Sequence, residues 1–222
     1  MSMRGAALPL VLALSALGCQ SHPEKGVVDQ YFNAVNSKDS QTLSSFAAVS
    51  FDKKVDRWAI KDNLAEQTTK APLPALAQKV KDLDAELAAN TKAARSYNND
   101  HYVELDQLKS AKKDAPVPAK LQPVKAEWEK FNEKDRELKK AIAKARAEVE
   151  KEKRSVLRSV GQVDDIESLD GEMKEKKIEL DLTIDGQVRP YVMTVRKYEI
   201  KRESGGRRVV SRWVVQELVP KG

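Results

Sequence analysis

The chain has 222 residues, of which 41% are apolar, 33% are charged and only 5% are aromatic. This length corresponds to one or two domains, and high charge with few aromatic residues favours long solvated helices over a dense β-sandwich. A single cysteine excludes an internal disulfide and a cysteine-based metal cluster, and two histidines do not suffice for a histidine-rich metal site. We therefore expect no metal and no cofactor, and the net charge of +6 favours anionic partners.

The first nineteen residues have the pattern of a secretion signal. Arg4 precedes an apolar run over residues 6–17, which is shorter than the roughly 20 residues of a membrane-spanning helix. The run ends in Ser15-Ala16-Leu17-Gly18-Cys19, which resembles the lipobox of bacterial lipoproteins, although leucine stands two residues before the cysteine instead of three. The alternative is an ordinary secretory peptide followed by a stray cysteine.

The lipobox resemblance implies where the protein is located. Residues 1–18 would be removed as a signal peptide, Cys19 would carry the diacylglycerol and palmitate chains, and residues 19–26 would form a lipidated tether. Gln20 stands where aspartate marks inner-membrane retention in many Gram-negative bacteria. The resemblance therefore implies a lipid anchor in the outer membrane facing the periplasm, where nucleic acid is not an expected partner.

Residues 71–160 are expected to form a long antiparallel helical hairpin. Apolar residues recur with a period near 3.5 over residues 76–108 and again over residues 121–160, which is typical of a coiled coil. Ala115-Pro116-Val117-Pro118 interrupts the pattern and supplies the reversal, because proline is not tolerated inside a helix. Each helix would be about 55 Å long. A reversal at residue 115 brings together Leu108 and Leu121, Leu87 and Ala145, and Leu76 and Val156.

Two features of this hairpin are candidates for function. Five lysines surround the reversal against one acid, Asp114, and can contact anionic headgroups or peptidoglycan, unless they form an ordinary solvated loop. These lysines are Lys109, Lys112, Lys113, Lys120 and Lys125. Residues 96–102 are poor in strong helix formers, which indicates a hinge or recognition patch, or alternatively a polar position in the seam between the helices.

The flanking segments, residues 27–70 and 161–222, together predict one small α+β domain. Residues 27–35 have a helical apolar face, and Asp39 is a candidate N-cap for a second short helix. Residues 55–60 predict a strand with Trp58 and Ile60 on one face, and a helix is the alternative. Alternating apolar residues over 178–184, the Asp185-Gly186 turn, and the segments 191–200 and 209–219 predict an antiparallel meander, with the two helices covering its apolar face.

The opening helix, residues 27–39, and the closing Arg212-Trp213-Val214-Val215 resemble NTF2-like (cystatin-like) α+β domains. The chain departs from that family in its strand count and in the hairpin, which would be an insertion after the first strand. The resemblance implies a concave sheet face lined by aromatic side chains, which either line a pocket or fill an ordinary core. The candidate lining residues are Tyr31, Phe32, Phe46, Trp58, Tyr198 and Trp213.

These segments contain no recognisable catalytic arrangement: neither histidine lies in them, and lone carboxylates such as Asp29 or Asp56 are the only candidate bases. Asp164-Asp165-Ile166-Glu167 lacks the ligand spacing and the glycine of a calcium loop. The sequence therefore predicts a non-enzymatic envelope lipoprotein, an interaction or scaffold module whose hairpin reaches a protein or cell-envelope partner, with homo-oligomerisation left open. The alternatives are an NTF2-like pocket protein that binds a small apolar ligand, and a periplasmic adaptor of a transport assembly, whose glycine-rich lipoyl-type halves are missing here.

Overall fold

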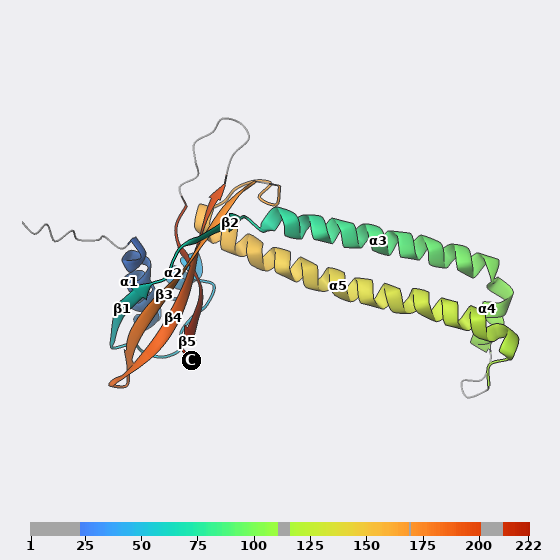
Figure 1. Ribbon diagram of the computed structural model, residues 1–222, viewed down its shortest axis with the longest axis horizontal. Coiled ribbons are helices and arrows are strands. Elements are labelled where there is room, and N and C mark those ends of the chain that lie inside the picture. Colours follow the sequence, from blue (N-terminus) through green and yellow to red (C-terminus); the bar gives the residue numbers. More distant parts are fainter. Residues whose placement is uncertain (1–22, 111–115, 169, 201–210) are drawn as a thin grey trace, which may run out of the picture.

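The computed structural model describes residues 23–110, 116–168, 170–200 and 211–222. Figure 1 shows an antiparallel sheet flanked by short helices, from which two long helices extend side by side. The chain therefore has the mixed α+β architecture that the sequence predicts.

The two short helices are α1 (Pro23–Asn36) and α2 (Ser40–Phe46). Asp39 is the N-cap of α2, as predicted, and its side chain accepts a 2.9 Å hydrogen bond from the backbone N–H of Thr42. The Asn36 amide fixes the end of α1, because it donates to the carbonyl of Val55 at 2.7 Å and accepts from the N–H of the same residue at 2.9 Å.

All strand pairs of the sheet are antiparallel, in the order β1-β3-β4-β5, and β2 also pairs with β3. The strands are β1 (Arg57–Asn63), β2 (Gln67–Lys70), β3 (Gly171–Ile184), β4 (Gln187–Ile200) and β5 (Val214–Pro220). The β3–β4 hairpin turns at Asp185 and Gly186, both at positive φ, which confirms the predicted two-residue turn. β3 begins seven residues before the predicted strand, and β2 was not predicted, because its four residues are all polar and exposed.

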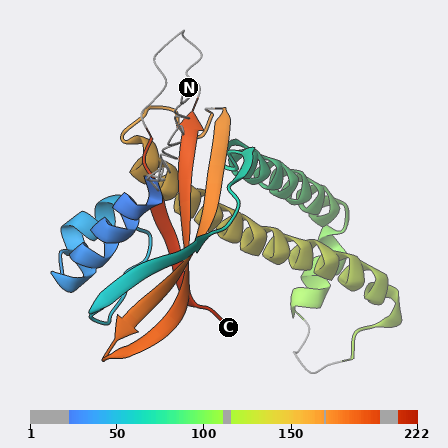
Figure 2. The same cartoon turned by 60° about the vertical axis from the view of Figure 1, so that its left-hand side comes forward.

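The main core lies between the sheet and α1 and α2. Alternate residues of β3, including Ile178, Leu180 and Leu182, point toward this side and are fully buried with Tyr31 and Phe32 of α1. Figure 2 shows α1 and α2 on one side of the strands and the two long helices leaving on the other.

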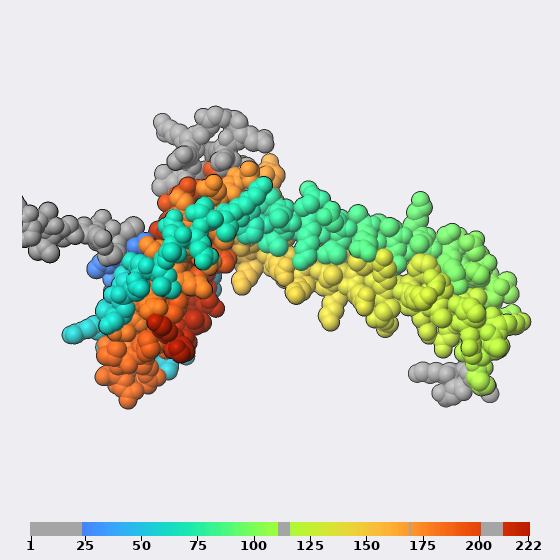
Figure 3. Space-filling model, in the orientation of Figure 1, coloured from blue at the N-terminus to red at the C-terminus, as the bar shows by residue number. Residues whose placement is uncertain are grey.

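The long helices form what we call the arm: α3 (Leu73–Asp100), α4 (Tyr102–Ser110), a 3₁₀ turn η1 (Ala119–Leu121) and α5 (Gln122–Val160). Figure 3 shows the arm projecting away from the rest of the molecule. The 39 residues of α5 correspond to about 58 Å. None of the described helices combines the length and the apolarity that crossing a membrane requires.

The predicted pairing of Leu87 with Ala145 is displaced along α5 by about two helical turns. It would place Asn90 opposite Ile142, but the Asn90 amide donates to the carbonyl of Phe131 at 3.2 Å. The displacement is smaller toward the sheet, where Arg146 bonds to Asp84 at 3.0 Å and Leu76 packs in one cluster with Val156, as predicted. The reason is that α3 ends at Asp100 and α4 is a separate helix. The described part of the reversal therefore begins at His101 and includes α4 and η1, so the reversal is not confined to the two prolines.

Candidate functional site

The far end of the arm, which we call the tip, comprises α4, η1 and the described residues 101 and 116–118. α3 ends at Asp100, and the next residue, His101, has a φ of −118° and a ψ of 26°, which are not helical, although its N–H still bonds to the carbonyl of Tyr97 at 3.0 Å. The preceding Asn98-Asn99-Asp100 are weak helix formers, so the helix ends where its propensity is lowest. The segment singled out in the sequence is therefore the place where the arm changes direction.

The tip has a small core of its own. The ring of Tyr97 lies 4.3 Å from that of His101 and 5.5 Å from that of Phe131, measured between centroids. Leu105 of α4 and Leu121 of η1 are also buried. Desolvation, with the negative charges of Glu127 and Glu104, raises the pKa of Tyr97 above its ordinary value. The rings thus connect the end of α3 to α5, and α4 also contacts α5.

The surface of the tip combines exposed apolar and cationic side chains. Tyr102 is 65% exposed and Val103 is 62% exposed, although both are large apolar residues. Lys109 and Lys120 are exposed and form no ion pair with any described residue, whereas Lys125 lies 3.6 Å from Glu129. The remaining two candidate lysines, Lys112 and Lys113, lie outside the described residues. Such a surface can contact a partner that offers apolar groups and negative charge.

Most of the predicted pocket-lining aromatic residues are part of the packed core. Tyr31, Phe32 and Phe46 are fully buried there, and Trp213 packs against them half-buried. Trp58 is also half-buried, and its indole N–H donates to Asp29 at 2.8 Å. A hydrogen bond from Lys25 is the main cause that holds the pKa of Asp29 below its ordinary value; burial opposes it, and the bond from Trp58 adds to the lowering.

Tyr198 does not join the other five aromatic residues. It stands three residues after Val195, which faces the main core, so it points to the opposite face of the strand. There it forms a second cluster with Leu73, Val156 and Val160 of the arm. The predicted grouping of six aromatic residues around one cavity is therefore wrong for Tyr198.

A polar cluster fixes the arm to the sheet, and we call it the joint: Glu152, Ser155, Ser159, Arg196 and Tyr198. The hydroxyl of Tyr198 donates to Glu152, which is 7% exposed, at 2.7 Å, and Arg196 lies 3.8 Å from the same carboxylate. Ser159 donates to the carbonyl of Arg212 at 2.8 Å and accepts the N–H of Tyr198 at 3.1 Å. Ser155 donates to Gln216 at 2.9 Å. Burial, with the Glu152 charge, raises the pKa of Tyr198 above its ordinary value.

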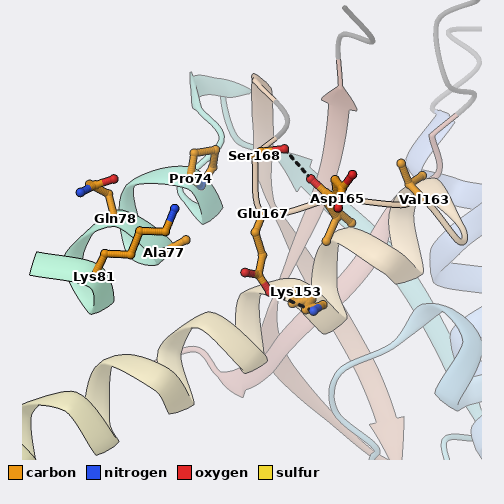
Figure 4. A pocket seen from close by; sticks show the side chains of 10 residues that line it. Pro74, Ala77, Gln78, Lys81, Lys153, Val163, Asp165, Glu167 and Ser168 are labelled. Atoms are coloured by element: carbon orange, nitrogen blue, oxygen red, sulfur yellow. Dashed lines mark hydrogen bonds and ion pairs between the residues drawn. The ribbon is translucent and has the colours of Figure 1, made fainter. Parts of the chain in front are cut away.

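A cleft of about 560 Å³ opens at the base of the arm, between the first turns of α3 and residues 163–168. Figure 4 shows Pro74, Ala77, Gln78 and Lys81 on one side, and Val163, Asp165, Glu167 and Ser168 on the other. Lys153 pairs with Glu167 at 2.9 Å, and Ser168 donates to the carbonyl of Asp165 at 2.8 Å. Lys81 and Lys153 thus line the same cleft as two of the acidic residues, Asp165 and Glu167. No group of three or more metal-ligating side chains occurs among the described residues.

Comparison of the chain with models of known protein families, with curated proteins and with solved structures gave no match.

Proposed function

We propose that this protein is a lipid-anchored, non-enzymatic scaffold of the bacterial cell envelope, whose arm presents its tip to a partner. The observation that carries the proposal is the exposure of Tyr102 and Val103, at 65% and 62%, at the far end of a long projecting arm. Scattered exposed apolar residues are common on protein surfaces, but neighbouring ones at the end of a projecting element can form a contact patch.

The joint supports this role because it gives the arm a defined direction. The cluster of Tyr198 with Leu73, Val156 and Val160, and the bonds of Ser155 and Ser159 to residues 212 and 216, attach α5 to both β4 and β5. A tip carried on such a base meets its partner at a set distance and orientation, which lowers the entropy lost on binding.

We further propose that α1, α2 and the sheet form an NTF2-like domain into which the arm is inserted between β2 and β3. In support, the N–H of Ala71 donates to the carbonyl of Gly171 at 2.9 Å, so the chain leaves and re-enters the sheet at neighbouring positions. Replacing residues 73–168 with a short glycine-serine linker, together with Tyr198→Ser and Ile200→Ser, should leave a folded sheet with cooperative thermal unfolding. Loss of that transition would oppose the insertion.

The anchor is proposed to be acylated Cys19 in the outer membrane, facing the periplasm. Mass spectrometry of mature protein from host membranes should find cleavage before Cys19 and the mass of two or three acyl chains. The Cys19→Ala variant should be released from the membrane fraction. An unmodified Cys19 in membrane-bound wild-type protein would overturn this assignment.

The tip is tested by site-specific crosslinking in the host cell. A photoreactive amino acid in place of Tyr102 should yield a discrete adduct, while the same group in place of Lys140, an exposed residue of α5, should not. Changing Lys109, Lys120 and Lys125 to glutamate should reduce the Tyr102 adduct. Equal adducts at the two positions, or an adduct insensitive to the charge reversal, would contradict recognition by the tip.

A further inference from the structure

A second recognition surface lies along the arm, short of the tip. A groove of about 410 Å³ runs between α3 and α5, within the size range of small-molecule sites, about 300–1,000 Å³. We call it the asparagine groove. Its principal lining residues are Asn90, Asn98, Asn99, Asn132, Trp128 and Phe131.

The groove is rich in side-chain amides. The chain contains seven asparagines, and four of them line this groove. Asn90 donates to the carbonyl of Phe131, whereas the side chains of Asn98, Asn99 and Asn132 form no hydrogen bond with any described residue. Asparagine is a weak helix former, so these positions cost helix stability compared with alanine or lysine, the commonest residues in the helices of the arm.

The aromatic residues of the groove are accessible. Trp128 and Phe131 are both half-buried and lie three residues apart on α5, so they share a face of the helix. The indole N–H of Trp128 has no acceptor among the described residues. Ring surface and a free donor are thus available beside the free amides.

The charge of the groove also restricts its ligand. Arg95 and Asp135 both line it and cancel each other, so the groove is close to neutral. A groove of similar size elsewhere on the arm differs, because Glu86, Lys130, Lys134 and Glu137 line it and Glu86 pairs with Lys134 at 2.9 Å. The asparagine groove thus offers uncommitted amides and ring surface in place of paired charges.

We propose that the asparagine groove binds a neutral saccharide chain. The C–H faces of a pyranose ring pack on aromatic rings such as Trp128 and Phe131, and its hydroxyl and acetamido groups exchange hydrogen bonds with amides, which both donate and accept. The groove adjoins the tip, because the ring of Phe131 also packs on Tyr97, but its proposed ligand does not depend on what the tip binds. The glycan of a cell wall and an unacetylated glucan share this chemistry, and the experiment separates them.

The three tryptophans supply the assay, because ¹⁵N-labelled protein has three indole N–H signals, and Trp128→Phe identifies the one that belongs to Trp128. Titration with tetra-N-acetylchitotetraose and, separately, with maltotetraose should shift the Trp128 signal saturably and leave those of Trp58 and Trp213 in place. A response to the acetylated sugar identifies an amino-sugar glycan, and a response to maltotetraose identifies a glucan.

The double variant Asn98→Ala/Asn132→Ala should bind about tenfold more weakly, yet unfold at the same temperature as wild type or higher, because alanine is the better helix former. The matched control Asn33→Ala changes an exposed asparagine of α1 and should bind like wild type. The proposal is overturned if neither sugar shifts the Trp128 signal, or if the double variant binds as tightly as the control.

Discussion

The joint between the arm and the sheet offers the sharpest test of how this structure is held together. Tyr198→Phe removes one hydroxyl, which donates to Glu152 at 2.7 Å in a site where the carboxylate is 7% exposed. Hydrogen bonds to charged groups contribute about 1.5–3 kcal/mol, and the loss leaves a buried carboxylate with one partner fewer. We therefore expect the free energy of unfolding to fall by about 2 kcal/mol. In a chain of this length that corresponds to about 4–8 °C in Tm.

Guanidinium unfolding followed by far-UV circular dichroism measures this loss. The matched control is Tyr191→Phe, since Tyr191 is also buried in β4 but its hydroxyl bonds to no described residue, and its loss should cost less than about 0.5 kcal/mol. A second variant, Tyr198→Phe/Glu152→Leu, replaces both partners with apolar groups and should recover most of the stability. Equal effects of the two Tyr→Phe changes would refute the reasoning, and so would a double variant weaker than Tyr198→Phe alone.

The same hydroxyl predicts a dependence on pH. Burial raises the pKa of Tyr198 above 10, its ordinary value, so its stabilising effect is complete below pH 10 and is lost as pH rises toward the folded-state pKa. The advantage of wild type over Tyr198→Phe should therefore shrink by about 1.4 kcal/mol between pH 8 and pH 11. Burial likewise raises the pKa of Tyr31 to about 12, but Tyr31 is present in both proteins and cancels in the difference.

Three further changes test local features. Gly171→Ala should destabilise the start of β3 by about 2 kcal/mol in guanidinium unfolding, because its Cβ would lie 2.5 Å from the carbonyl oxygen of Glu199, whereas Gly26→Ala, with nothing within 4 Å, should be neutral or stabilising. Leu105→Ala should remove amide exchange protection from α4 and leave the sheet protected, because its burial supports the tip alone. Asp29→Asn should shift the fluorescence of Trp58, because it changes the group that accepts the indole N–H. The pKa of Asp29 is lowered, so the carboxylate persists in wild type until the pH falls below 4. Below that pH the fluorescence of wild type should approach that of the variant.

Where a local pattern has one physical solution, the sequence predicted the structure well. Alternation over residues 178–184 requires an extended segment with one buried face, and Asp185-Gly186 accepts the positive φ values of a two-residue turn. Asp39 predicted the start of α2 in the same way, because its carboxylate has a backbone N–H three residues away to bond.

Features that depend on tertiary contacts were not predictable from such patterns. The pairing of the long helices was misplaced because a heptad repeat allows several registers, and only the end of α3 at Asp100 selects among them. The sequence contains one indication of the joint: the acidic residue Glu152 occupies an apolar position of the heptad repeat. A buried carboxylate requires partners, but the sequence could not show that Tyr198 and Arg196 of a distant strand provide them.

Buried residues are distributed unevenly along the arm, and this distribution bears on the oligomeric state of the protein. Only Leu73 and Asn90 of the 28 residues of α3 are buried, whereas α5 buries five of its last nine residues at the joint. Two helices that cover only one side of each other retain little stability far from the sheet, so amides in the middle of the arm should exchange faster than those of β3 and β4. Equally slow exchange in the isolated protein would mean that a second arm covers the seam, and the protein would then be an oligomer joined through its arms.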